Sequence, residues 1–232
     1  PVLWPLTHPG LPRTNDNLPH YFRTVELDHL LRQGVLFPRW APDLVHGHGY
    51  PVFNFFPYLS HYLVEILHLA GLSFLAALKA AYVLVVLLAA WSAFQLGREH
   101  FGETAGLVAG VAYIYSPFLL YDIHIRGSLP EALALAILPL AMLHLRRAAH
   151  GHRRSTVWAG VAITALMLAH NGVSLQVMPF LLAYAVLEAF LEVRSQRSEV
   201  GSRKSAVSRQ SPAIPRPLSF VIRHFSPVIR LS

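Results

Sequence analysis

The 232-residue chain has no cysteine and few charged residues, and both shortages narrow the classes of protein to which it can belong. Without cysteine the chain can form neither disulfides nor cysteine-ligated zinc or iron–sulfur sites. Charged residues make up 13% of it and hydrophobic residues 54%, whereas soluble domains carry roughly 25% charged residues. Together with a mean hydropathy of +0.43, this composition predicts a chain that lies mostly in lipid.

Five apolar runs follow residue 71, and each is a candidate transmembrane helix. A helix that rises about 1.5 Å per residue needs roughly 20 residues to cross about 30 Å of hydrocarbon. The fourth run is shorter than this, so it has to borrow polar neighbours, thin the bilayer or be partly re-entrant. We therefore predict an all-α polytopic helix bundle. Its spans are residues 72–96, 104–120, 129–145, 157–169 and 173–191.

The loops between these runs predict their orientation, because Lys and Arg accumulate on the cytoplasmic side of a membrane. The loop after the third run and the segment after the fifth run are basic, whereas the loops on the other side of the membrane contain Arg126 as their only basic residue. This asymmetry predicts an extracytoplasmic segment at 1–71, a bundle at 72–193 and a basic, disordered cytoplasmic tail at 194–232. The basic residues behind this assignment include Arg146, Arg147, Arg153, Arg154, Arg194 and Arg197.

The same distribution of charge bears on localisation and partners. Positive charge spread over membrane-flanking loops argues against binding of nucleic acid, which needs a continuous basic face. We expect the cytoplasmic (inner) membrane as the location and membrane lipids as partners. Because an extracytoplasmic N-terminal segment has to be delivered across the membrane, we also expect the chain to be a fragment that lacks an upstream signal anchor.

The extracytoplasmic segment at 1–71 contains most of the polar and aromatic residues that could form a site. Residues 24–33 have the apolar spacing of an amphipathic helix, with Leu27 and Leu30 on one face, and we expect this helix to lie at the membrane interface. The segment is too short for a confident independent core, so it is expected to pack on the bundle at the water interface.

Four separated motifs resemble a known family. They are TNDNLPHYFR at Thr14 to Arg23, GVLFPRWAPDLVHGHGYPVFNFFPYLSHYL at Gly34 to Leu63, RGSLPEALALAILPLAM at Arg126 to Met142 and AHNG at Ala169 to Gly172. The chain resembles a bacterial group of polytopic membrane proteins within the GT-C glycosyltransferase superfamily, often labelled 6-pyruvoyl-tetrahydropterin synthase-related. The three-His zinc site of the soluble synthase cannot be assembled from these helices.

The resemblance implies transfer of a sugar from a polyprenyl-phosphate donor to an acceptor at the outer face of the membrane. In the superfamily an acidic residue early in the first outside loop acts as a base or as a ligand to a divalent metal, and here that residue is Asp16. A carboxylate can accept the acceptor's proton if it lies within hydrogen-bonding reach. Asp16 stands in Thr-Asn-Asp-Asn, however, so it could equally cap the helix that follows.

Arg126 and Glu131 are the next candidates, at the mouth of the third span. A guanidinium suits the phosphate of a lipid-linked donor, and Arg39 offers the same chemistry. Glu131 is costly near a membrane unless it is paired, which makes it a candidate for substrate or metal binding. It also follows Pro130 in a first helical turn, where it could simply meet the helix dipole and pair with Arg126.

Several histidines and their neighbours are predicted to line the same cavity. His46-Gly47-His48 has a spacing that could share a metal ion, but a glycine-rich turn with two interfacial histidines is the more frequent use of such a pattern. If a divalent metal is a cofactor, Asp16 and Glu131 are its candidate ligands. The predicted cavity residues are Glu131, His20, Asp43, His46, His48, Tyr50, His170 and Asn171.

A second class of function remains open from the sequence. The chain could be a non-catalytic multipass protein, either a transporter or a lipid-binding scaffold, made inactive by truncation. Transporters often carry polar sites at mid-membrane depth, and Gln176 is the clearest polar residue inside a predicted span. The remaining polar groups cluster near the outer rim, which favours surface chemistry over passage of a solute.

Overall fold

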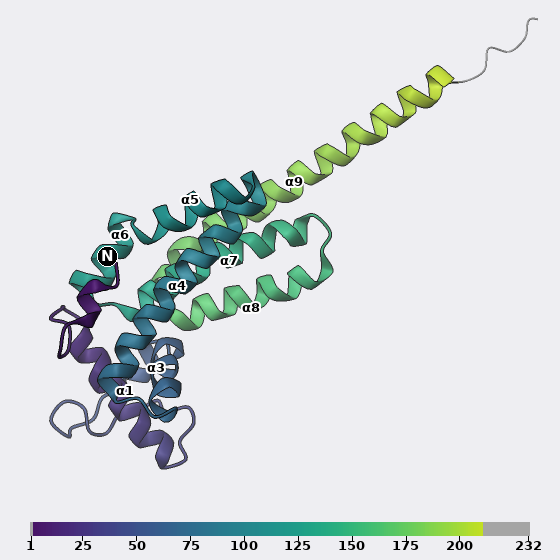
Figure 1. Ribbon diagram of the computed structural model, residues 1–232. Helices are drawn as coiled ribbons and strands as arrows, with labels where there is room; N and C mark the ends of the chain where they lie inside the picture. Colours follow the sequence, from purple (N-terminus) through teal and green to yellow (C-terminus); the bar gives the residue numbers. More distant parts are fainter. Residues whose placement is uncertain (1, 211–232) are drawn as a thin grey trace, which may run out of the picture. The chain divides into compact units, whose positions relative to one another are not determined.

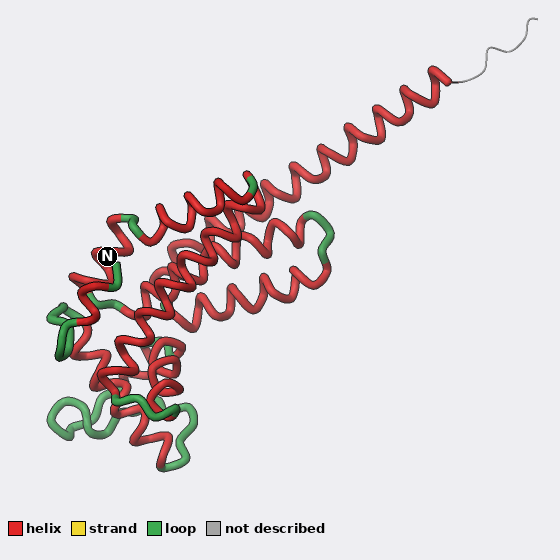
Figure 2. The backbone as a smooth tube through the Cα atoms, viewed as in Figure 1, coloured by secondary structure: helices red, strands yellow, loops and turns green. Residues whose placement is uncertain are grey.

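The computed structural model describes residues 2–210, and their side chains as far as residue 200. Within that range the chain is helix, turn or loop, with an isolated antiparallel bridge between Ala41 and Tyr50 (Figure 2). It divides into two compact units, residues 1–192 and 193–232. The description below concerns the first unit, which contains the packed helices.

The N-terminal part of the first unit is a layer of short helices beside the bundle. Helix α1 packs against α3 and α4, which confirms that this segment rests on the bundle (Figure 1). Leu27 and Leu30 of α1 are buried with Ala41, Val52 and Phe53 in a small apolar cluster. The helices of the layer are η1 (Trp4–Thr7), α1 (Asn17–Arg32), α2 (Val52–Phe55) and α3 (Leu59–Leu69).

The bundle consists mainly of longer helices, in which α4 and α5, and α7 and α8, are antiparallel, whereas α4 and α7 run parallel. Helix α5 lies along α4, α8 lies along α7, and α4 contacts α7 at the centre (Figure 1). Glycines allow the α4–α5 approach, because a Cβ on Gly106 would lie 2.8 Å from the carbonyl oxygen of Phe94. The helices are α4 (Phe74–Phe101), α5 (Glu103–Ile114), α6 (Pro117–Tyr121), η2 (Asp122–Arg126), α7 (Leu129–Ala149), α8 (Arg153–Ala169) and α9 (Asn171–Gln210).

Four stretches of the described chain are long and apolar enough to cross a membrane, namely 74–101, 103–126, 129–149 and 171–200. They coincide with four of the five predicted spans, which confirms a multi-pass helical membrane protein. The fifth predicted span, 157–169, lies in α8, whose 17 residues reach only about 25 Å. A crossing by α8 stays a prediction.

Two elements differ from the sequence-based expectation. The second span is not one helix, because α5 ends at Ile114 and α6 begins at Pro117. The break occurs here because Pro117 has no backbone N–H and disfavours α-helical geometry at Ser116. The predicted disordered tail, 194–232, starts instead as the continuation of α9 to Gln210, since residues 195–210 contain no proline and many helix-forming residues. Residues 211–232 lie outside the described part of the chain.

Candidate functional site

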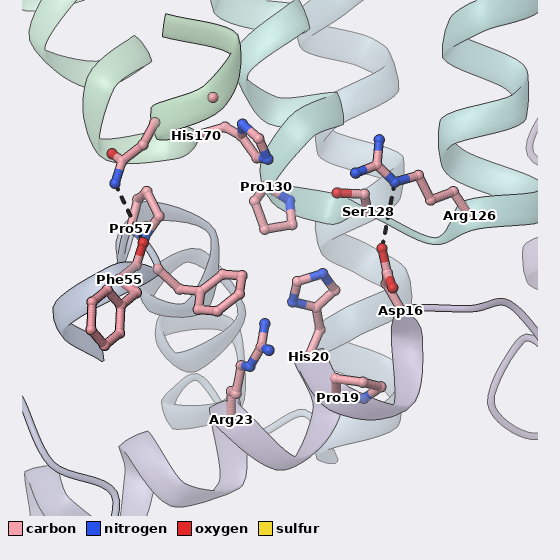
Figure 3. A pocket seen from close by; sticks show the side chains of 13 residues that line it. Asp16, Pro19, His20, Arg23, Phe55, Pro57, Arg126, Ser128, Pro130 and His170 are labelled. Atoms are coloured by element: carbon pink, nitrogen blue, oxygen red, sulfur yellow. Dashed lines mark hydrogen bonds and ion pairs between the residues drawn. The ribbon is translucent and has the colours of Figure 1, made fainter. Parts of the chain in front are cut away.

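A polar cavity of about 250 Å³ lies at the end of the bundle where α1, α7 and α9 begin. It gathers side chains that are far apart in the sequence, from α1, the α2–α3 turn, the η2–α7 junction and the α8–α9 turn (Figure 3). Of the residues predicted from the sequence, it is lined by Asp16, His20, Arg126, His170 and Asn171.

The wall around Arg126 is built on an unusual turn. Residues 122–126 form a π-helix, a rare geometry that is frequent at functional sites. The segment before α1 lies against this turn, since the Asp16 backbone N–H donates to the Arg126 carbonyl at 2.8 Å. Gly127 closes the turn at φ +73°, and a Cβ there would lie 2.0 Å from Thr14 Oγ1. Only glycine fits this contact, which sets Asp16 beside Arg126.

Replacing Gly127 with alanine should loosen this contact and destabilise the protein. The added methyl group meets Thr14, and the left-handed conformation that Gly127 already has is strained for alanine, so we expect a loss of more than about 2 kcal/mol in the free energy of unfolding. Gly151→Ala is a matched control, because Gly151 also has a positive φ, +84°, but open space around its Cβ position. It should cost only about 1 kcal/mol. Equal losses in detergent unfolding experiments would contradict the steric role of Gly127.

Asp16 occupies the N-cap position of α1, yet its side chain makes no capping hydrogen bond. Thr14 performs that role, because its Oγ1 accepts from the Asn17 backbone N–H at 3.2 Å. The alternative role of Asp16 as a side-chain cap is therefore not what the structure shows. Its Oδ2 lies 3.5 Å from Nε of Arg126 instead, at the edge of the cavity (Figure 3).

Arg126 is surrounded by carboxylates. Besides Asp16, its Nη1 contacts Glu131 Oε2 directly and lies 3.7 Å from Asp122 Oδ1. Glu131 is 7% exposed, so its carboxylate depends on this guanidinium for compensation. The pairing of Glu131 with Arg126, one of the two roles considered above, is thus present. The cation that Asp16 and Glu131 share in the structure is the Arg126 side chain.

The histidines of the cavity are placed to remain neutral. Burial lowers the pKa of His20 well below its usual value, and the neighbouring His61 and Arg23 lower it further. Burial also lowers the pKa of His61, to about 4. The two rings stand 5.6 Å apart between centroids, and both side chains are buried. His20 therefore offers the cavity an uncharged imidazole at neutral pH.

His170 and Asn171 form the turn between α8 and α9 and also line the cavity. The Nδ1 of His170 accepts from the Val173 backbone N–H at 3.0 Å, so in the neutral ring the proton lies on Nε2. Burial lowers the pKa of His170. Asn171 donates from its side chain to the Phe55 carbonyl at 3.4 Å, which ties this turn to the N-terminal layer (Figure 3).

The other predicted residues do not share this cavity. Asp43, His46 and Tyr50 line a second cavity of about 520 Å³ on the other side of α1 residues Pro19 and Arg23. Arg39 and His48 are exposed, and neither is among the residues that line the two cavities. The structure therefore places the predicted site residues in two cavities instead of one. The roles assigned to Arg39 and His48 stay predictions.

The geometry of the described residues gives no support to the predicted metal site. Among the residues that the structure describes, no group of three or more His, Asp or Glu side chains could hold a metal ion. His46 and His48 belong to a turn in which Val45 and His46 both have φ +57°, and their side chains are exposed. The glycine-rich turn is thus the arrangement that forms, and a divalent metal stays an untested expectation.

Arg23 is a site residue that the sequence-based selection missed. It lines both cavities, and its guanidinium carbon stands 4.0 Å above the ring of Phe56. A signal was available, because Asp16, His20 and Arg23 are spaced by four and three residues and so lie on one face of a helix. Phe56 carried no such signal, since its position depends on the turn between α2 and α3.

These observations define a multi-pass helical membrane protein with a polar cavity at one end of its bundle. The model of the 6-pyruvoyl-tetrahydropterin synthase related domain, described as a membrane protein, matches residues 53–203, and the chain belongs to this family. This match confirms the predicted group. No curated protein and no solved structure matches the chain. Arg126 and His170 fall inside the matched region, whereas Asp16 precedes it.

Proposed function

We propose that the protein is a GT-C-like glycosyltransferase, or the N-terminal part of one, that transfers a sugar from a polyprenyl-phosphate donor at the extracytoplasmic face. The observation that carries the proposal is the cavity itself, where a carboxylate, neutral histidines and guanidinium groups converge from four segments. Arg146 and Arg147 lie at the end of α7, whereas the cavity adjoins its beginning. The positive-inside rule therefore favours an outward-facing cavity.

Asp16 is the proposed catalytic base. In this reaction the acceptor oxygen forms a bond to the anomeric carbon while the bond from that carbon to the phosphate oxygen breaks. The acceptor's proton passes to the Asp16 carboxylate, and the lipid phosphate leaves with the electron pair. The side chain of Asp16 is 39% exposed, so an acceptor hydroxyl can reach it, and Arg126 holds it at one edge of the cavity.

Replacing Asp16 with asparagine tests this proposal. Asparagine keeps the shape but cannot accept the proton, so we expect transfer to fall by at least about a hundredfold in a polyprenyl-phosphate sugar assay. Glu103→Gln is the control, because Glu103 is exposed at the start of α5 and lines none of the cavities described above. Wild-type transfer by a folded Asp16→Asn protein would exclude Asp16 as the base.

A non-catalytic lipid-binding scaffold is the second candidate, and one observation favours it. Asp16 already faces Arg126, so a purely structural ion pair would explain its position without chemistry. A transporter receives less support, because Gln176 is exposed on α9 and does not line the two cavities. Lipid binding by the wild type, with no transfer to any acceptor in the presence of a complete donor set, would favour the scaffold.

A further inference from the structure

Arg23 differs from the other arginines of the packed unit because it is half-buried and yet has no ion pair, whereas the other arginines without an ion pair are exposed. Arg32, Arg126, Arg146 and Arg147 each form an ion pair with a carboxylate. Among the residues whose side chains are described, Arg23 has neither an ion pair nor a hydrogen bond, and its guanidinium instead lies over the ring of Phe56. A half-buried guanidinium without a counter-charge is costly unless a ligand supplies one.

The surroundings of Arg23 leave its charge uncompensated. His20 and His61 are buried and neutral, and the positive charge of Arg23 contributes to the lowering of the pKa of each. Asp16 lines the same cavity and favours the charged form of Arg23 from a distance, but its ion pair is with Arg126. Burial lowers the pKa of Arg23 itself, although a guanidinium stays protonated in proteins. This part of the cavity wall therefore carries a positive charge that lies over an aromatic ring and forms no ion pair with a described residue.

The position of Arg23 between the two cavities indicates where a bound ligand would lie. Figure 3 shows the side chain rising from α1 into the first cavity, and the second cavity adjoins it on the other side. The second cavity is bounded by a turn in which Val45 has a left-handed conformation that is unfavourable for a β-branched residue. A ligand whose anionic group meets Arg23 thus has room on both sides of that group.

Arg126 is poorly suited to bind a phosphate group. Its guanidinium already meets Asp16, Asp122 and Glu131, so an incoming phosphate would face acidic groups as well as the cation. Phosphate recognition by arginine requires free N–H groups in a planar fork. Arg23 has these groups available, and its stacking on Phe56 fixes the plane of the fork.

We propose that Arg23 is the residue that binds the phosphoester of the ligand, in place of Arg126 and Arg39, and that the phosphate lies where the two cavities meet. The inference rests on the proposed function for the identity of the anion. Its evidence is separate, namely an unpaired guanidinium that stacks on an aromatic ring and lines both cavities.

The experiment measures binding of farnesyl phosphate to the full chain in nanodiscs of neutral phosphatidylcholine. Arg23→Ala should weaken binding by about ten- to a hundredfold, the usual effect of losing hydrogen bonds to a charged group. Arg23→Lys should lose less, because it keeps the charge but not the fork. Arg98→Ala removes the same charge from an exposed arginine that lies over the ring of Phe94 and lines neither cavity, so it should bind like the wild type.

Further measurements distinguish a free phosphate ligand from a lipid headgroup and test whether each variant is folded. Inhibition by inorganic phosphate would identify a free anion as a ligand, and inhibition by phosphatidylglycerol added to the nanodisc would identify a lipid headgroup. Thermal unfolding checks each variant, and Arg23→Lys carries the test if Arg23→Ala does not fold. Binding by Arg23→Ala within twofold of the wild type, or an equal loss in Arg98→Ala, would overturn the inference.

The outcomes also distinguish this inference from the proposed function. Loss of binding in Arg23→Ala, with transfer unaffected by Asp16→Asn, would overturn the proposed base and leave Arg23 as the anion site. Unchanged binding in Arg23→Ala, with transfer abolished by Asp16→Asn, would overturn the anion site and leave the base. Failure of the wild type to bind any of the phosphate probes would overturn the inference directly.

Discussion

Replacing Arg126 with alanine should destabilise the protein by about 3–5 kcal/mol, because the change leaves the buried carboxylate of Glu131 without its cation. Glu131 is 7% exposed, and Arg126 is the guanidinium that contacts it. Asp16, more exposed, loses the same partner. The measurement is the free energy of unfolding in detergent micelles, supported by the yield of folded protein after purification.

The origin of this loss can be checked with a second change. Arg126→Ala combined with Glu131→Gln removes one of the stranded charges, so the double variant should recover part of the stability. Arg39→Ala removes an arginine from an exposed site and should shift stability by less than about 0.5 kcal/mol. A loss of under 1 kcal/mol in Arg126→Ala would mean that the carboxylates are compensated by other groups.

The second large effect is expected at the other end of the bundle, where Arg146 of α7 holds Glu188 of α9. Arg146 Nη1 lies 2.9 and 2.7 Å from the two carboxylate oxygens of Glu188, and Glu188 is 3% exposed. His100 and His150 approach the same carboxylate at 3.5 and 3.8 Å, but a histidine is charged only when protonated. Arg146→Ala should therefore cost about 3 kcal/mol in the free energy of unfolding.

Arg147 provides a matched control for this prediction. It neighbours Arg146 on the same helix and pairs with Glu99 at 2.7 Å, but the two side chains are 29% and 27% exposed. Partly solvated pairs contribute about 0–1 kcal/mol, so Arg147→Ala should change stability little. Similar losses in the two variants, measured under the same unfolding conditions, would show that burial of the acid does not decide the cost.

The membrane architecture could be predicted from the sequence because it depends on local composition. Runs such as 72–96 and 129–145 are apolar over the length that a span requires, and the helices α4 and α7 form there. The break at Pro117 was also encoded locally, although hydropathy alone did not show it. Segment 157–169 stayed ambiguous because its length lies near the limit for crossing.

The membership of the candidate site could be predicted only in part. Asp16, Arg126 and His170 were selected by residue type and resemblance, and the fold brings them to one cavity. Asp43 and His46 were selected for the same reasons, but the fold places them behind α1 in a second cavity. Distances between such residues depend on how α1 packs on the bundle, and no pattern within a single segment encodes that packing.

By itself the sequence determined a cysteine-free, multi-pass helical protein with its polar groups near the ends of its spans, because hydrophobicity and helical spacing act over neighbouring residues. Tertiary structure alone decided which charges compensate one another. It pairs Arg126 with Asp16 and Glu131, lets Thr14 cap α1, and leaves Arg23 stacked on Phe56 with no acidic partner among the described residues. Electrostatic energies depend on distance and burial in three dimensions, which residues far apart in the chain acquire only when it folds.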